Sequence, residues 1–299
     1  MGRRMPAVAG SFYEGTAERL RRQIENCFLH RLGPGKLPPP DNERRTDMPI
    51  IGLVCPHAGY MYSGPTAARA YFAIASQRTP EVVIIIGPDH HGLAGDVSVY
   101  PEGVWVTPLG EVLIASDVAK RLVEACPIAD ESELAHRYEH SLEVQVPFIQ
   151  FCFGQSVPIV PVMIGHQTKD VAMTLGDTIA QVIHDTNAVI IASTDFTHYE
   201  PQSQAKKKDE LILKRIEAID PDGVFDVVRK HRVTMCGYGP TAALLYACRK
   251  LGCESAKVLG YSTSGDIIGD YSQVVGYGAV AVFKAGYEPS SLQLDFVAR

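Results

Sequence analysis

The sequence predicts a single α/β domain whose sheet is mostly parallel or mixed and is covered by helices on both faces. Two observations support this fold class. Short apolar runs rich in β-branched residues, at 50–54, 81–86 and 188–192, alternate with longer segments in which apolar residues recur at helical spacing. No change of composition divides the 299 residues, of which 46% are hydrophobic and 21% charged. We therefore expect residues 1–299 to form one packed domain.

Apolar residues at helical spacing predict the helices. Leu20, Ile24 and Phe28 recur every four residues in the first helix, and Leu175 and Ile179 do the same in a later one. Each of these segments therefore has one apolar face that can pack against a sheet. On this pattern, helices are expected at 17–31, 65–76, 116–125, 139–151, 168–184, 203–218, 221–231 and 240–251.

Runs of β-branched and apolar residues predict the strands, and 81–86 is the clearest of them. The run at 157–164 contains two prolines, which favours a place near a sheet edge or at a bulge. Short pieces within 96–114 suit a small antiparallel ribbon that carries Trp105. Strands are expected at 50–54, 81–86, 157–164, 188–192, 256–262 and 274–284. An extended arm over 1–16, a surface loop over 33–49 and a loosely defined tail over 285–299 complete the chain.

Charge and composition restrict the partners that we expect. The net charge of −6 and the pI of about 5.9 argue against nucleic acid or an anionic membrane as the main partner. No apolar run approaches the roughly 20 residues that a membrane-spanning helix needs. The N-terminal residues lack the apolar region of a signal peptide. The seven cysteines show no CxxC spacing, which favours a reducing cytoplasm.

Residues able to bind a metal follow several of the expected strands. His57 follows the first strand, His90 and His91 follow the second, and Cys236 precedes a helix. In open α/β sheets, the edge formed by the carboxyl ends of the strands is the usual ligand site. Imidazole and thiolate together suit zinc, iron or copper. The sequence thus predicts a metal site that is assembled from loops far apart in the chain.

Ordinary structural roles compete with this hypothesis. Cys236 is also compatible with a buried structural thiol, although a nearby helix N-terminus favours thiolate. Asp195 and His198 suit either a ligand and an acid–base group, or a helix cap beside a surface histidine. Glu139 and His140 suit either a substrate-contacting patch or an ordinary helix start. Residues alone leave these alternatives open.

Taken together, these segments resemble the Memo family. The motifs occur in family order, and the chain is similar to prokaryotic, archaeal-type members. Five ordered motifs are far more specific than any one of them. The matching motifs are Pro56-His57-Ala58-Gly59-Tyr60, Gly87-Pro88-Asp89-His90-His91, Glu139-His140-Ser141-x-Glu143, Ser193-Thr194-Asp195-Phe196-Thr197-His198 and Met235-Cys236-Gly237.

The resemblance implies a fold related to the class III extradiol dioxygenases, which are non-haem iron enzymes. It implies that His57, His90 and Cys236 are the metal ligands. It further implies that Asp195 lines the same pocket and that His198 is its acid–base histidine. Cys236 stands where the dioxygenases have a carboxylate, which argues against catechol ring cleavage. The residues expected to contact substrate are Tyr60, His91, Glu139 and His140.

Three functions are compatible with such a pocket. The first is an iron- or copper-dependent oxidoreductase acting on a small organic molecule, with His198 moving protons. The second is a non-catalytic adaptor that binds a small molecule or peptide; family resemblance also implies a link to a radical-SAM companion system. The third is a zinc hydrolase in which Asp195 or Glu139 is the base. The sequence does not name the substrate or the native metal.

Overall fold

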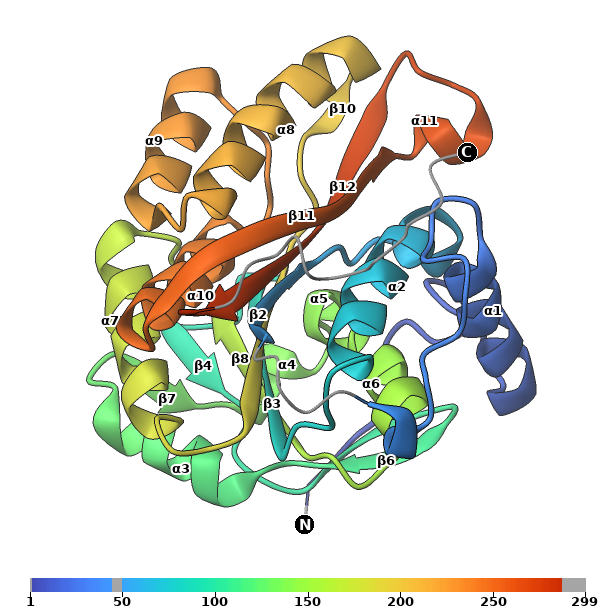
Figure 1. Ribbon diagram of the computed structural model, residues 1–299. Coiled ribbons are helices and arrows are strands. Elements are labelled where there is room, and N and C mark those ends of the chain that lie inside the picture. The colour runs from blue at the N-terminus through green and yellow to red at the C-terminus, as the bar shows by residue number, and fades with distance from the viewer. Residues whose placement is uncertain (1, 45–49, 287–299) are drawn as a thin grey trace.

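The structure, a computed structural model, describes residues 2–44 and 50–286 (Figure 1). Within them, a large mixed sheet is flanked by helices, and the buried hydrophobic side chains form one continuous cluster. The α/β fold with a mixed sheet that the sequence predicts is therefore confirmed. No helix in this described part is long and apolar enough to cross a bilayer. Parts of the expected 33–49 loop and 285–299 tail lie outside the described residues.

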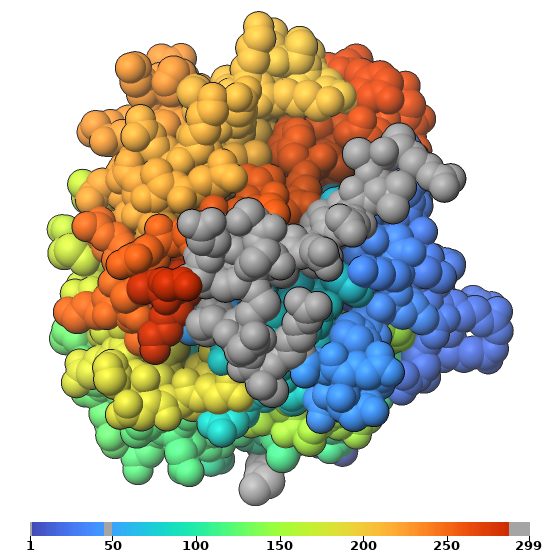
Figure 2. All heavy atoms as spheres, in the orientation of Figure 1, coloured from blue at the N-terminus to red at the C-terminus, as the bar shows by residue number. Residues whose placement is uncertain are grey.

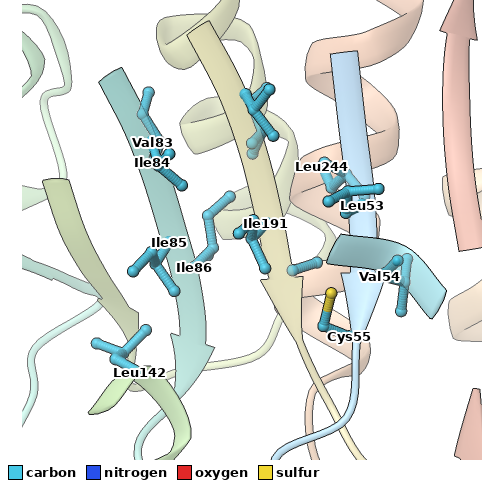
Figure 3. Packing of buried hydrophobic residues seen from close by; sticks show 14 of the residues in the cluster. Leu53, Val54, Cys55, Val83, Ile84, Ile85, Ile86, Leu142, Ile191 and Leu244 are labelled. Carbon is cyan, nitrogen blue, oxygen red and sulfur yellow. The ribbon is translucent and has the colours of Figure 1, made fainter. Parts of the chain in front are cut away.

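Four parallel strands form the centre of the sheet in the order β2-β9-β3-β8. All four are buried and rich in β-branched residues, as expected for strands covered on both faces. Figure 3 shows Val54, Ile191 and Ile85 on the three neighbouring strands β2, β9 and β3. The bounds are β2 (Ile50–Cys55), β9 (Ala188–Ser193), β3 (Val82–Pro88) and β8 (Ile159–Ile164).

An antiparallel strand adjoins this centre on each side. Strand β12 (Val274–Lys284) pairs with β2 and in turn with β11 (Cys253–Thr263) and the short β10 (His198–Glu200). Strand β4 (Val97–Val99) pairs with β8, and β7 (Ala129–Glu131) pairs parallel with β4. The expected ribbon exists as β5 (Val104–Thr107) and β6 (Gly110–Leu113), and it is joined by β1 (Arg3–Arg4) from the N-terminal arm.

Helices cover both faces of the sheet. Helix α10 packs on β2, β3 and β9, and α2 packs on β2, β11 and β12. Figure 2 shows the orange segment around α11 above the blue N-terminal helix α1, where Arg31 donates to the Asp266 carbonyl at 2.7 Å. The α-helices are α1 (Ala17–Leu29), α2 (Tyr60–Ala75), α3 (Ser116–Ala125), α4 (Glu133–His136), α5 (His140–Glu143), α6 (Val146–Phe153), α7 (Lys169–Val182), α8 (Gln202–Glu217), α9 (Pro221–His231), α10 (Tyr238–Lys250) and α11 (Gly265–Ile268), and Asp41–Glu43 forms a 3₁₀ turn.

Strand β8 lies third from an edge of the sheet, as its prolines led us to expect, and Pro161 falls just beyond Val162, the last residue that β4 pairs. Two other local predictions were wrong, and each concerns a proline. Helix α2 begins at Tyr60 and contains Pro65, so the proline does not mark its start. The expected helix at 139–151 is split into α5 and α6, because Pro147 lacks the amide that a continuous helix needs and instead opens α6.

Candidate metal centre

The loops after β2, β3 and β9 meet at one edge of the sheet. Because β9 lies between β2 and β3 and all three run parallel, their carboxyl ends point the same way. His57, His90 and Asp195 each follow one of these ends. The loop before α10 brings Cys236 to the same edge, and its amide donates to the Asp195 carbonyl at 3.2 Å.

The three expected metal ligands converge there. One ring nitrogen of His57, one of His90 and the sulfur of Cys236 lie within 4.8 Å of one another. The Cys236 Sγ atom is 3.2 Å from His57 Nε2. Gly237 permits this approach, since a Cβ atom there would lie 2.5 Å from the Ser193 carbonyl oxygen. The close packing of the two loops therefore explains the glycine of the Met-Cys-Gly motif.

Glu139 supports His90 through both the ring and the backbone. Its carboxylate accepts from His90 Nδ1 and from the His90 amide, each at 2.8 Å. Burial disfavours the Glu139 charge, but the bonds from His90 outweigh it and hold the pKa of Glu139 well below its usual range. An ionised carboxylate only accepts, so His90 carries a proton on Nδ1, and in the neutral ring Nε2 is the nitrogen available for a ligand bond.

His57 is supported differently. Its ring is 2% exposed, and Nδ1 lies 2.9 Å from Ser193 Oγ. The His57 amide donates to Asp195 Oδ1 at 2.8 Å, which fixes the backbone. Burial, followed by the neighbouring His140 and His90, lowers the pKa of His57 well below its usual value. His57 is therefore neutral near pH 7, as a metal ligand must be.

Cys236 is held as a thiol in the metal-free chain. Burial raises the pKa of Cys236, and the Asp195 carboxylate raises it further. The Asp195 amide donates to Sγ at 3.2 Å. A bound cation reverses this balance, because a coordinating thiol is deprotonated. Two imidazoles with fixed outer hydrogen bonds and one thiol fit a soft or borderline transition metal such as zinc, iron or copper.

Asp195 and His198 stand beside this cluster. Asp195 Oδ2 is 4.0 Å from His57 Nε2, and burial raises the pKa of Asp195 to about 6. His198 is partly buried, and its Nδ1 lies 2.8 Å from the Thr234 carbonyl, an acceptor that places the proton on Nδ1. The acid–base role of His198 stays a prediction. Tyr199, next to His198, has φ 58, a strained conformation for a non-glycine residue.

Two of the four expected substrate-contacting residues join the cluster. His140 stacks on His90 with 4.6 Å between ring centroids, and its ring lies 5.3 Å from that of His57. Burial lowers the pKa of His140 to about 4, so its ring is neutral. Glu139, His90 and His140 also form a second group of close ligand atoms. Phe12 from the N-terminal arm covers His140 at 4.8 Å.

Tyr60 and His91 are not brought into the cluster. Tyr60 is 2% exposed, and its hydroxyl donates to the Val144 carbonyl while its ring packs on Phe148. His91 is exposed in the turn that Asp89 organises, with its ring 6.3 Å from that of Tyr138. Their role in substrate binding stays a prediction.

Sequence reasoning missed three supporting residues. Ser193 contacts the His57 ring, Gln145 donates to Ser193 Oγ at 2.8 Å, and Glu143 anchors the N-terminal arm. Ser193 and Glu143 lie inside the motifs described above, and this position was the only sign in the sequence of their supporting roles. Gln145 gave none, because its side-chain hydrogen bonds all go to residues distant in sequence.

An α/β fold with two histidines and one cysteine at the carboxyl edge of its sheet defines a class of candidate metalloproteins. Comparison with known sequences narrows this class. The chain belongs to the Memo-like protein family, whose model matches residues 4–281.

Archaeal relatives are similar over nearly the whole chain. A MEMO1 family protein of Methanopyrus kandleri is 48% identical over 95% of this chain and 99% of its own length. One from Methanothermobacter thermautotrophicus is 49% identical over 92% of this chain and 98% of its own. Among solved structures, an uncharacterised protein from Escherichia coli K12 has a TM-score of 0.54 at 14% identity, covering 78% of this chain and 99% of that one. This last likeness concerns the fold alone.

Proposed function

We propose that this chain is an oxidoreductase that uses iron or copper, held by His57, His90 and Cys236, to act on a small organic molecule. The observation that carries the proposal is the convergence of three ligand atoms within 4.8 Å. Each imidazole also has its other nitrogen in a hydrogen bond, to Ser193 or to Glu139, as metal-binding histidines usually do.

The residues around the ligands suit proton transfer. When bound, the metal supplies one-electron chemistry that side chains lack. Burial raises the pKa of Asp195 to about 6, so its carboxyl group beside His57 can take up and release a proton close to neutral pH. His198 presents Nε2 while Thr234 holds Nδ1. Phe12 packs on His140 at one side of the cluster.

The test is the metal content of protein purified without oxygen. Wild type is expected to hold about one iron or copper per chain, and Cys236→Ala is expected to lose it. Cys126→Ala is the matched control, because Cys126 is a buried thiol outside the cluster. Bound iron or copper would then justify a screen for oxygen consumption with small organic substrates.

Other results would redirect the proposal. Zinc that is lost in Cys236→Ala, with activity unaffected by removing oxygen, would identify a hydrolase. No metal in wild type, and none taken up on addition, would overturn both enzymatic functions. The cluster would then be a binding site for a peptide or small molecule, or for a protein of a radical-SAM system.

A further inference from the structure

One short segment, Glu139–Gln145, supports both candidate histidine ligands. Its first residue holds the His90 ring, as described above. The Ser141 amide donates to Glu139 Oε1 at 2.8 Å, while the Ser141 carbonyl accepts from Ser193 Oγ at 2.6 Å. The segment is therefore continuous, through hydrogen bonds, with the residue that contacts the His57 ring.

The hydrogen bonds of Ser193 determine which way its bond to His57 runs. A hydroxyl has one proton and two lone pairs. The Ser193 proton goes to the Ser141 carbonyl, which can only accept. One lone pair receives Gln145 Nε2 at 2.8 Å. The second lone pair is left for His57 Nδ1, at 2.9 Å, so the imidazole must be the donor.

The orientation of the Gln145 amide is fixed independently. Its Nε2 also donates to the Pro56 carbonyl at 3.1 Å, and its Oε1 accepts from the Tyr71 hydroxyl at 2.7 Å. If the amide were flipped, Gln145 Oε1 would face the Pro56 carbonyl oxygen, and neither oxygen can donate a hydrogen bond. Gln145 therefore holds the residue before His57 by its backbone and, through Ser193, the His57 ring.

We propose that Ser193 and Gln145 are positioning residues that keep His57 in the tautomer with its proton on Nδ1, so that the Nε2 lone pair faces Cys236. The contact between Cys236 and His57 agrees with this assignment. The Cys236 sulfur lies 3.2 Å from Nε2 and 3.5 Å from the Asp195 carbonyl, so the one thiol proton has two acceptors within reach when Nε2 is bare. The same lone pair is the one that a metal requires.

This inference names the supports of a ligand in the proposed function, but its first test needs no metal. Nitrogen NMR of the histidine rings in metal-free protein distinguishes a protonated from a bare ring nitrogen. Wild type is expected to show His57 with the proton on Nδ1 alone. A His57 proton on Nε2 in wild type would overturn the proposal, whatever the variants do.

Variants then test the cause. Ser193→Ala is expected to shift His57 toward the form with its proton on Nε2, while Ser98→Ala, which also removes a fully buried hydroxyl, should leave it unchanged. Metal affinity should fall by about 10- to 100-fold in Ser193→Ala and not in the control. Should Ser193→Ala fail to fold, Gln145→Met provides the same readouts with a smaller expected shift. An unchanged tautomer in the folded variant would contradict the proposal.

The two failures are distinguishable. If wild type binds no metal yet shows the Nδ1 proton, the proposed function fails and the positioning roles stand. If wild type binds metal and Ser193→Ala binds it equally well with an unchanged tautomer, only the positioning roles fail.

Discussion

The two histidines of the cluster face the same metal position but are supported in opposite ways. His90 has a side chain that is 30% exposed, and its ring is bonded to the Glu139 carboxylate. His57 is 2% exposed, and its ring is bonded to the neutral hydroxyl of Ser193. Although burial opposes it, Glu139 raises the pKa of His90, whereas burial lowers that of His57.

This difference separates two tasks that a metal site requires. A charged acceptor strengthens an imidazole as a ligand, but it also favours the protonated ring that cannot bind metal. A neutral acceptor in a buried position fixes the tautomer without favouring the extra proton. Of the two histidines, His57 is therefore neutral and able to bind a metal near pH 7, whereas at His90 a proton competes with the metal.

The largest effect should come from replacing Arg4, which anchors the Glu139–Gln145 segment that supports both histidines. Arg4 donates to Glu143 at 2.6 Å, with side chains 3% and 1% exposed, and it also donates to the Glu139 carbonyl at 2.8 Å. Arg4→Met leaves a buried carboxylate without its cation, which should cost about 3–5 kcal/mol of unfolding free energy. Denaturant unfolding measures this.

The control for the anchor is the exposed ion pair of Arg3 with Glu111, at 59% and 49% exposure. Arg3→Met should cost less than about 1 kcal/mol. Equal losses in the two variants would show that Arg4 is not a special anchor of the Glu139–Gln145 segment.

The next largest effect should distinguish the support of His90 from the support of His57. Glu139→Gln removes the charge that holds His90 and should lower metal affinity by about 10- to 100-fold. The His57 tautomer should stay as in wild type, because Ser193 is untouched. Competition with a chelator of known affinity measures the metal affinity. Nitrogen NMR of the histidine rings measures the His57 tautomer. Glu111→Gln, on the surface, serves as the control; a changed His57 in Glu139→Gln would argue against separate supports.

The pH response of the metal-free chain should differ between the two rings. His90 should take up a proton above the usual 6.5, and His57 should stay neutral well below it. A difference of one pH unit in pKa corresponds to about 1.4 kcal/mol. NMR titration of the ring protons measures both, and coincident titration would refute the comparison.

The same shifts predict the pH dependence of stability, with opposite signs. The folded pKa of His90 is above its unfolded value, so its contribution is fully present below pH 6.5 and is lost as pH rises through the raised pKa. The folded pKa of His57 is depressed, so this residue costs stability as pH falls below 6.5. In Glu139→Gln, the pH dependence of the unfolding free energy should lack the contribution of His90 and keep that of His57.

The smallest effect should come from Tyr71, which supports His57 only through Gln145 and Ser193. Tyr71→Phe keeps the ring that stacks on Phe148 but removes the hydroxyl that donates to Gln145. We expect a loss of about 1 kcal/mol of unfolding free energy. Metal affinity should fall less than in Glu139→Gln. A larger fall than in Glu139→Gln would mean that the neutral support, not the charged one, dominates the site.

Local sequence patterns predicted much of the fold and the ligand types. The runs at 50–54, 81–86 and 188–192 became β2, β3 and β9 because continuous β-branched and apolar residues suit strands that are buried on both faces. Helices such as α3 and strand β12 also lie where their spacing placed them. The predictions that failed, at Pro65 and Pro147, concern helix boundaries: a proline lacks an amide, and whether a helix continues past it depends on packing that the local sequence does not show.

The sequence by itself determined that histidines follow buried strands and that a cysteine precedes a helix in an α/β chain, since those features depend on local spacing alone. It did not determine that the ends of β2, β9 and β3 adjoin, because strand order is set by packing between residues far apart in the chain. The roles of Ser193, Gln145 and Glu143 were decided only by the tertiary structure. A buried hydroxyl, amide or carboxylate takes whichever partners folding brings within hydrogen-bond distance, and the tautomer of His57 follows from those partners.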